Sequence, residues 1–143
     1  MNTDNDKLYA DCDQSFYESL FKCGSFGEHM RVIINAKGWD TAEFCMWTEL
    51  NASMFSRIKR ESYIPDIRTF VTLCVSMELD MLIMVRLLQF TKINVLQKDT
   101  LLQKYFDVID NCRGKDIAYC NEVLKGLGVE DKCLLGTRKN REN

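Results

Sequence analysis

Proline and glycine are scarce in this sequence of 143 residues, which has one proline and seven glycines. Collagenous, turn-rich and long disordered chains need far more of both residues, so these classes are excluded. Long apolar runs are also missing: the stretch 81–85 ends at Arg86, far short of the roughly 20 residues that span a bilayer. Residues 1–6 are polar and acidic and do not resemble a signal peptide. We therefore expect a cytoplasmic protein without a membrane segment.

Residues typical of catalytic, metal and phosphate-binding sites are rare in this sequence or lack the spacing that such sites need. Histidine occurs once, at His29, which we interpret as a surface or capping-turn residue. No two cysteines have the close spacing of a zinc knuckle, and there is no glycine-rich phosphate loop. We therefore predict no metal, no cofactor, no catalytic residues and no enzyme activity. An odd number of cysteines without a secretion signal indicates reduced thiols, at positions 12, 23, 45, 74, 112, 120 and 133.

Charge of one sign does not dominate the chain, whose formal net charge is −2. This balance excludes a globally basic packer of nucleic acid but permits a local basic surface. Acidic residues exceed basic ones before residue 86, and basic residues exceed acidic ones from 86 to 143. The short stretch 51–60 holds three cations, Arg57, Lys59 and Arg60, and no acid.

Apolar residues at helical spacing, together with capping residues, predict an all-α fold. A first helix is expected over residues 8–22, ending near Gly24. Five further helices are expected up to residue 90, the third of them being Ala52–Arg60. Their predicted N-caps are Ser25, Asp40, Asn51, Asp66 and Asp80.

Two more helices are expected after a short link, one ending near Gly114 and one over residues 116–127. Three regions follow from this pattern: an N-terminal helical arm (1–24), a central helical domain (25–90) and a C-terminal helical extension (91–143). The polar and basic residues from Gly136 onward are expected to fray.

A known pattern is matched in order, spacing and capping across the central domain. The matching stretches are Phe26-Gly27-Glu28, Lys37-Gly38-Trp39, Ala42-Glu43-Phe44-Cys45, Asn51–Ile58 and Pro65–Phe70. Over residues 25–85 the chain resembles the phage-repressor-like (XRE or Cro-type) helix-turn-helix family. The resemblance implies a five-helix lambda-repressor-like domain that binds operator DNA as a homodimer. In such dimers the third helix enters the major groove, and half-sites lie about one helical turn (~34 Å) apart.

DNA recognition requires donors and acceptors on an exposed helix edge, flanked by cations for the phosphates. On the expected third helix Asn51, Ser53 and Arg57 supply hydrogen-bonding groups, and Ala52 and Met54 supply apolar contacts for thymine methyl groups. The residues predicted to contact double-stranded DNA are Thr41, Asn51, Ala52, Ser53, Met54, Arg57, Lys59, Arg60 and Arg68.

The chain departs from the family pattern at three places. Thr41 stands where the family usually has glutamine, and Glu49 stands where the tight turn usually has glycine. Recognition-helix positions that usually have long polar side chains are here Ala52, Ser53 and Met54. These changes favour an alternative in which the chain is a protein–protein interaction module, an accessory or antitoxin-like subunit that has lost DNA binding. A third hypothesis, a thiol-based redox regulator, requires an exposed reactive thiol, for which Cys112 beside Arg113 is the candidate.

The expected helix over residues 81–90 is apolar on nearly every side, so we predict that it is covered on more than one side. It is our candidate for the homodimer interface, through Met81, Met84, Val85 and Leu88. A protein partner could instead bind through residues 81–127.

Overall fold

The computed structural model describes residues 14–96 and 99–136, where the regular elements are helices joined by turns and loops. Residues 14–21 form the end of the expected first helix, whose predicted beginning lies outside the described residues. No strand occurs in the described ranges, so the all-α prediction is confirmed. The helices are α2 (Phe26–Lys37), α3 (Thr41–Thr48), α4 (Ala52–Arg57), α5 (Ile67–Ser76), α6 (Met81–Leu88), α7 (Thr100–Cys112), α8 (Ile117–Gly126) and a 3₁₀ turn, η1 (Asp131–Cys133).

All five predicted N-caps are formed. In each one the side-chain oxygen accepts a hydrogen bond from the backbone N–H three residues later, which satisfies a group that the helix leaves unpaired. The donor–acceptor distances lie between 2.8 and 3.3 Å for Ser25, Asp40, Asn51, Asp66 and Asp80.

One helix is shorter than predicted, because α4 ends at Arg57 and not at Arg60. After Ile58 the amides bond to carbonyls only three residues back: Lys59 N donates to Ser56 O, and Arg60 N donates to Arg57 O. These tighter bonds turn the chain out of the α-helical path. The buried side chain of Ile58 anchors the turn in the core.

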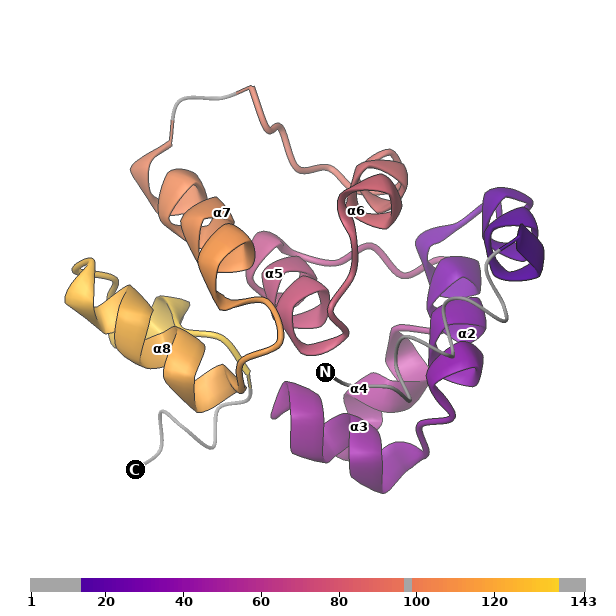
Figure 1. Ribbon diagram of the computed structural model, residues 1–143, viewed down its shortest axis with the longest axis horizontal. Coiled ribbons are helices and arrows are strands. Elements are labelled where there is room, and N and C mark those ends of the chain that lie inside the picture. The colour runs from indigo at the N-terminus through magenta and orange to yellow at the C-terminus, as the bar shows by residue number, and fades with distance from the viewer. Residues whose placement is uncertain (1–13, 97–98, 137–143) are drawn as a thin grey trace.

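The core is built around α5, which lies at the centre of the molecule (Figure 1). Seven of its ten residues, 69–75, are buried. It packs against α3, α7 and α8, so the predicted C-terminal extension shares one core with the central domain. The first helix belongs to the same core through Phe16 and Leu20. Residues from all three predicted regions therefore pack into one hydrophobic core.

His29 lies in the core and not at the surface, so our surface interpretation is wrong. The side chain is fully buried, with Nδ1 2.6 Å from the carbonyl oxygen of Ser25. Arg86 Nε donates to the other ring nitrogen at 3.2 Å. The ring is therefore the neutral tautomer with its proton on Nδ1, and burial lowers the pKa of His29 below 6.5. Its contact with the N-cap residue Ser25 agrees with the other part of the interpretation, a residue of the capping turn.

The α6 helix is covered on one side and open on the other. Ile83, Met84 and Leu87 are buried in the chain's own core, and Leu88 is half-buried. Met81, Leu82 and Val85 are each about half exposed. The exposed face of α6 therefore contains Met81 and Val85 of the predicted dimer interface, together with Leu82, which was not predicted. Met84, which was also predicted for the interface, is buried. None of the described helices is long and apolar enough to cross a bilayer.

Candidate nucleic-acid interface

Three residues, Glu49-Leu50-Asn51, join α3 to α4. Glu49 adopts the left-handed conformation, with φ 55°, which glycine adopts at lower cost. The side chain of Thr48 holds the turn, because its hydroxyl donates to Phe44 O at 2.7 Å and accepts from Leu50 N at 3.1 Å. The turn therefore has the backbone shape for which the family pattern uses glycine, with glutamate in its place.

The outer side of α4 is an exposed edge with polar groups. No residue of this helix is buried, and Ala52, Ser53 and Arg57 are exposed. Asn51 Oδ1 accepts from Met54 N at 3.3 Å and from the Ser53 hydroxyl at 2.7 Å. These bonds use the amide oxygen and leave the amide nitrogen of Asn51 as a donor toward solvent.

The far end of α4 is held by contacts that its own sequence does not reveal. The backbone of α2 at Gly27 lies so close to residues 59–60 that a Cβ on Gly27 would sit 2.0 Å from Arg60 O. Arg31 Nε, one turn further along α2, donates to Lys59 O at 2.9 Å. The glycine of the Phe26-Gly27-Glu28 stretch is thus required by a backbone-to-backbone approach, which fixes α4 relative to α2.

A groove of about 360 Å³ separates α4 from the start of α5. It brings together four of the residues predicted to contact DNA: Asn51, Met54, Arg57 and Arg68. Two cations therefore share one concave surface with an amide donor, next to the exposed edge of α4. The other lining residues are Leu50, Tyr63, Ile64, Asp66, Thr69 and Gly136.

The remaining predicted residues lie around this groove and not in it. Thr41 is exposed at the first turn of α3, and Arg60 is exposed beyond the end of α4. Lys59 lines a different cavity, against α2, where its ammonium lies 3.7 Å from the centre of the Phe55 ring. Arg68 is partly engaged, since its Nη1 donates to Lys132 O at 2.9 Å.

Several residues of the groove were missed by the sequence reasoning. Burial raises the pKa of Tyr63, whose side chain is hydrogen-bonded to Thr69, so the phenol stays protonated at neutral pH. Asp66 was predicted only as a cap, and its carboxylate is used by that cap. Gly136 donates its amide to Thr72 Oγ1, 64 positions earlier. No periodicity or motif signals such a contact, because it depends on how α8 folds back over α5.

Cysteines in the described ranges are buried or half-buried. Cys112, the candidate of the redox hypothesis, is buried, so the choice of this residue as an exposed reactive thiol is wrong. Burial raises the pKa of Cys120 to about 12 and raises the pKa of Cys74 as well, which keeps both as unreactive thiols. Residues 14–96 and 99–136 contain no group of three His, Cys, Asp or Glu side chains arranged for a metal ion.

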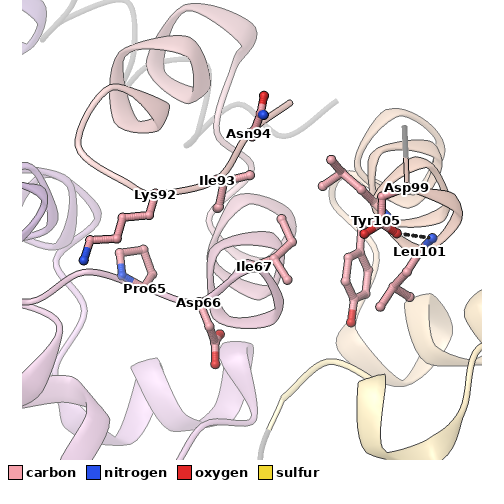
Figure 2. Close-up of a pocket in the computed structure, with 10 residues that line it drawn as sticks. Pro65, Asp66, Ile67, Lys92, Ile93, Asn94, Asp99, Leu101 and Tyr105 are labelled. Atoms are coloured by element: carbon pink, nitrogen blue, oxygen red, sulfur yellow. Dashed lines mark hydrogen bonds between the residues drawn. The ribbon is translucent and has the colours of Figure 1, made fainter. Parts of the chain in front are cut away.

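A second cavity, of about 300 Å³, lies between the start of α5, the connection after α6, and α7. Figure 2 shows Leu101 and Tyr105 of α7 across this cavity from Ile67 and Ile93. Asp99, at its rim, caps α7 through Leu101 N at 2.9 Å. The walls are mainly apolar and the rim carboxylate is already used by a helix cap, so we assign this cavity no ligand.

Comparison with protein-family models, with curated proteins and with solved structures found no match to this chain. Its function is therefore inferred from its residues and their geometry alone.

Proposed function

We propose that this protein is a sequence-specific DNA-binding transcriptional regulator of the repressor-like helix-turn-helix type. The observation that carries the proposal is the α3–α4 pair: a rigid left-handed turn at Glu49 followed by a capped helix with no buried residue. Met54 and Phe55 pack against the core, while Ala52, Ser53 and Arg57 are exposed, so α4 presents a polar edge that is suited to enter a groove of a partner molecule. The major groove of DNA admits a helix of this kind.

The roles of the residues follow from their positions. In this proposal the Asn51 amide and the Ser53 hydroxyl contact base edges, and Ala52 contacts a thymine methyl. Arg57 and Arg68, which share the α4–α5 groove, contact phosphates and set the orientation of α4. Two protomers would join through the exposed apolar residues of α6, so that two copies of α4 read one palindromic site.

Selection from a random DNA duplex pool tests this proposal directly. Purified protein is mixed with the pool at two salt concentrations, and retained duplexes are sequenced. We expect an inverted repeat to be enriched. The affinity is expected to fall as the salt concentration rises, because lysine and arginine side chains that bind phosphates release counterions from the DNA. Lack of retention even at low salt would overturn the proposal.

A double variant, Ser53→Ala with Arg57→Ala, assigns the binding to α4. The expected loss is at least tenfold in affinity for the selected site, with helicity unchanged, because both side chains are exposed and one good base contact is worth about 1–3 kcal/mol. The matched control is Ser15→Ala with Arg113→Ala, which removes the same groups from exposed positions on other elements. Equal affinity of the two double variants would exclude α4 as the recognition helix.

A second candidate function is a protein-interaction module on the same scaffold. It is favoured by exposed apolar side chains beside the polar edge, since Met46 and Trp47 of α3 are 62% and 46% exposed. Together with the open face of α6 they offer two apolar surfaces for a protein partner. Met46→Ser with Trp47→Ser distinguishes the two functions: DNA affinity is expected to stay unchanged if α4 binds DNA, and binding of a protein partner is expected to fall if α3 forms the interface.

A further inference from the structure

A cavity of about 360 Å³ lies between α2 and α4. None of its lining residues lines the α4–α5 groove. Part of its wall belongs to α2, where residues 31, 34 and 35 share one face because they are three and four positions apart. The rest consists of Trp39, Phe55 of α4, and Lys59 just after α4. The cavity therefore has a set of side chains of its own: Arg31, Ile34, Asn35, Trp39, Phe55 and Lys59.

Two aromatic rings in the cavity wall are held in place by the fold. Gly38 ends α2 in the left-handed conformation, with φ 70°, and the amides of Gly38 and Trp39 both donate to Ile34 O, at 3.0 and 3.3 Å. These bonds fold the chain back onto the last turn of α2, so the half-buried Trp39 lines the cavity. The Phe55 ring packs against Phe44 of α3, with 5.2 Å between the ring centres.

Two cations line the same cavity. The ammonium of Lys59 lies 3.7 Å from the centre of the Phe55 ring. Arg31 Nε donates to Lys59 O at 2.9 Å, which leaves the two Nη nitrogens of the guanidinium as donors. No acidic residue lines the cavity, and within residues 14–96 and 99–136 neither cation has an ion pair. Two positive charges therefore lie next to two aromatic rings without an acid to neutralise them.

We propose that this cavity binds a small molecule with one planar ring system and an anionic group, either a phosphate or a carboxylate. The ring packs against Trp39 and Phe55. Lys59 and Arg31 bind the anionic group through charge-assisted hydrogen bonds, which are stronger than neutral ones. The exposed amide of Asn35 supplies both a donor and an acceptor for polar groups on the ring.

The size and walls of the cavity favour a free small molecule over DNA. Small-molecule sites have volumes of roughly 300–1,000 Å³, so this cavity is near the lower limit and accepts about one ring system. The bases of a duplex are stacked on each other and do not offer their faces to aromatic side chains. The inference is independent of the proposed function, because it uses no residue of the polar edge of α4.

The fluorescence of Trp39 reports binding in the full chain. The sequence has two tryptophans, so Trp47→Phe, at a position 46% exposed on α3, leaves Trp39 as the single fluorophore. The probes are adenosine monophosphate and benzoate. Adenosine and benzamide are their neutral analogues, and inorganic phosphate is the anion without a ring.

We expect at least one of the two anionic probes to change the fluorescence of Trp39 in a saturable way. Its neutral analogue is expected to bind about tenfold more weakly or less, because the charge-assisted bonds are lost. Inorganic phosphate alone is expected to cause no saturable change. Binding of adenosine monophosphate only would assign the site to phosphates, and binding of benzoate only would assign it to carboxylates.

Removal of the two cations assigns the binding to the cavity. Arg31→Gln with Lys59→Gln is expected to weaken binding of the anionic probe about tenfold or more. The matched control, Arg113→Gln with Lys115→Gln, also removes an exposed arginine and a lysine beside a ring, since the ammonium of Lys115 lies 5.5 Å from the centre of the Tyr119 ring. The control is expected to bind as the parent does. Circular dichroism checks that both variants keep their helicity.

Asn35→Asp keeps the test decisive if the double variant does not fold. The new side chain has nearly the same shape, and its exposed position places a negative charge in the cavity wall. The anionic probe is expected to bind more weakly, while binding of the neutral analogue is expected to stay unchanged.

Three results would overturn the inference. One is the absence of a saturable change with either anionic probe up to about 10 mM, well above the roughly 1 mM that limits ordinary KM values. A second is equal binding of an anionic probe and its neutral analogue, which would show that the cations take no part. The third is equal affinity of the Arg31→Gln, Lys59→Gln variant and its control, which would place the probe elsewhere. Failure of α4 to bind DNA would leave all of these results unchanged.

Discussion

The helices α4 and α5 are neighbours in sequence and opposites in role. Seven residues of α5 are buried and none of α4 is. The longer helix is surrounded by the elements that it packs against, whereas the shorter one contacts the core only through the half-buried side chains of Met54 and Phe55. The difference teaches that the side chains of α5 are constrained by folding, while the exposed residues of α4, such as Ser53 and Arg57, are free to be chosen for contact with a partner.

The largest expected difference between α4 and α5 is in the loss of stability when one side chain of each helix is truncated to alanine. Phe70→Ala in α5 removes a fully buried ring and is expected to cost about 3–5 kcal/mol of unfolding free energy. Ser56→Ala in α4 changes an exposed residue, and its effect is expected within about 0.5 kcal/mol. Urea denaturation followed by circular dichroism measures both. Similar losses would mean that α4 is part of the core after all.

Gly27→Ala tests whether α4 is held from outside. A Cβ at this position would lie 2.0 Å from the backbone oxygen of Arg60, so α2 and the end of α4 must move apart. The expected cost is about 3 kcal/mol, although neither helix loses a side-chain contact. Gly126→Ala is the control, because a Cβ there meets no atom within 4 Å. Equal stability of the two variants would show that the approach at Gly27 is not rigid.

The N-cap of α4 allows a test with a smaller expected effect on stability. Asn51→Ala removes the side-chain bond to Met54 N and is expected to cost about 1 kcal/mol. Asn51→Ser keeps a capping oxygen and removes the amide nitrogen. We therefore expect the serine variant to retain stability and still lose affinity for the selected duplex. A serine variant that keeps full affinity would remove Asn51 from the base-contacting residues.

Glu49→Gly is expected to stabilise the protein. The φ of 55° at this residue costs about 1 kcal/mol for a residue with a side chain, and glycine relieves that cost. Glu43→Gly removes the same charge from within α3 and is expected to lose about 1 kcal/mol, because glycine weakens a helix interior. Thermal unfolding measures the melting temperature of both variants, and melting temperatures that shift in the same direction would contradict the prediction.

A change of pH is expected to have the smallest effect on α4 and α5, because the titrating group, His29, belongs to α2. Burial lowers the pKa of His29 in the folded protein below 6.5, so the unfolded chain takes up the proton first as the pH falls. The contribution of this histidine to stability is complete above pH 6.5 and is lost as the pH falls from there toward the folded pKa. Urea midpoints at pH 7.5, 6.5 and 5.5 measure the loss, which His29→Gln is expected to abolish.

Local features of the fold could be predicted from the sequence, because they depend on neighbouring residues. The cap at Asn51 and the positive φ at Glu49 are of this kind: a polar side chain bonds an amide three residues away, and the resemblance has glycine, which takes a positive φ cheaply, at the position of Glu49. The polar edge of α4 follows from the same reasoning. These features account for the candidate recognition helix.

The parts that could not be predicted depend on contacts between distant segments. The burial of His29 is decided by Arg86, 57 positions away. The position of Gly136 beside the α3–α4 turn is decided by Asn121 and Thr72. Apolar periodicity shows that a helix buries one face but not which helix covers it, so the groove beside α4 emerges only from the tertiary structure.

The link between the first helix and α6 has a consequence for synthesis of the protein. The hydroxyl of Tyr17 donates to Asp80, and Arg86 Nη2 donates to the carbonyl oxygens of Phe21 and Cys23 at 2.9 Å. These partners are 63 to 65 residues apart. At a translation rate of about 5–20 residues per second, the first helix leaves the ribosome roughly 3–13 s before the residues that secure it. In the growing chain the first helix therefore lacks these partners for that time, during which it is open to chaperones.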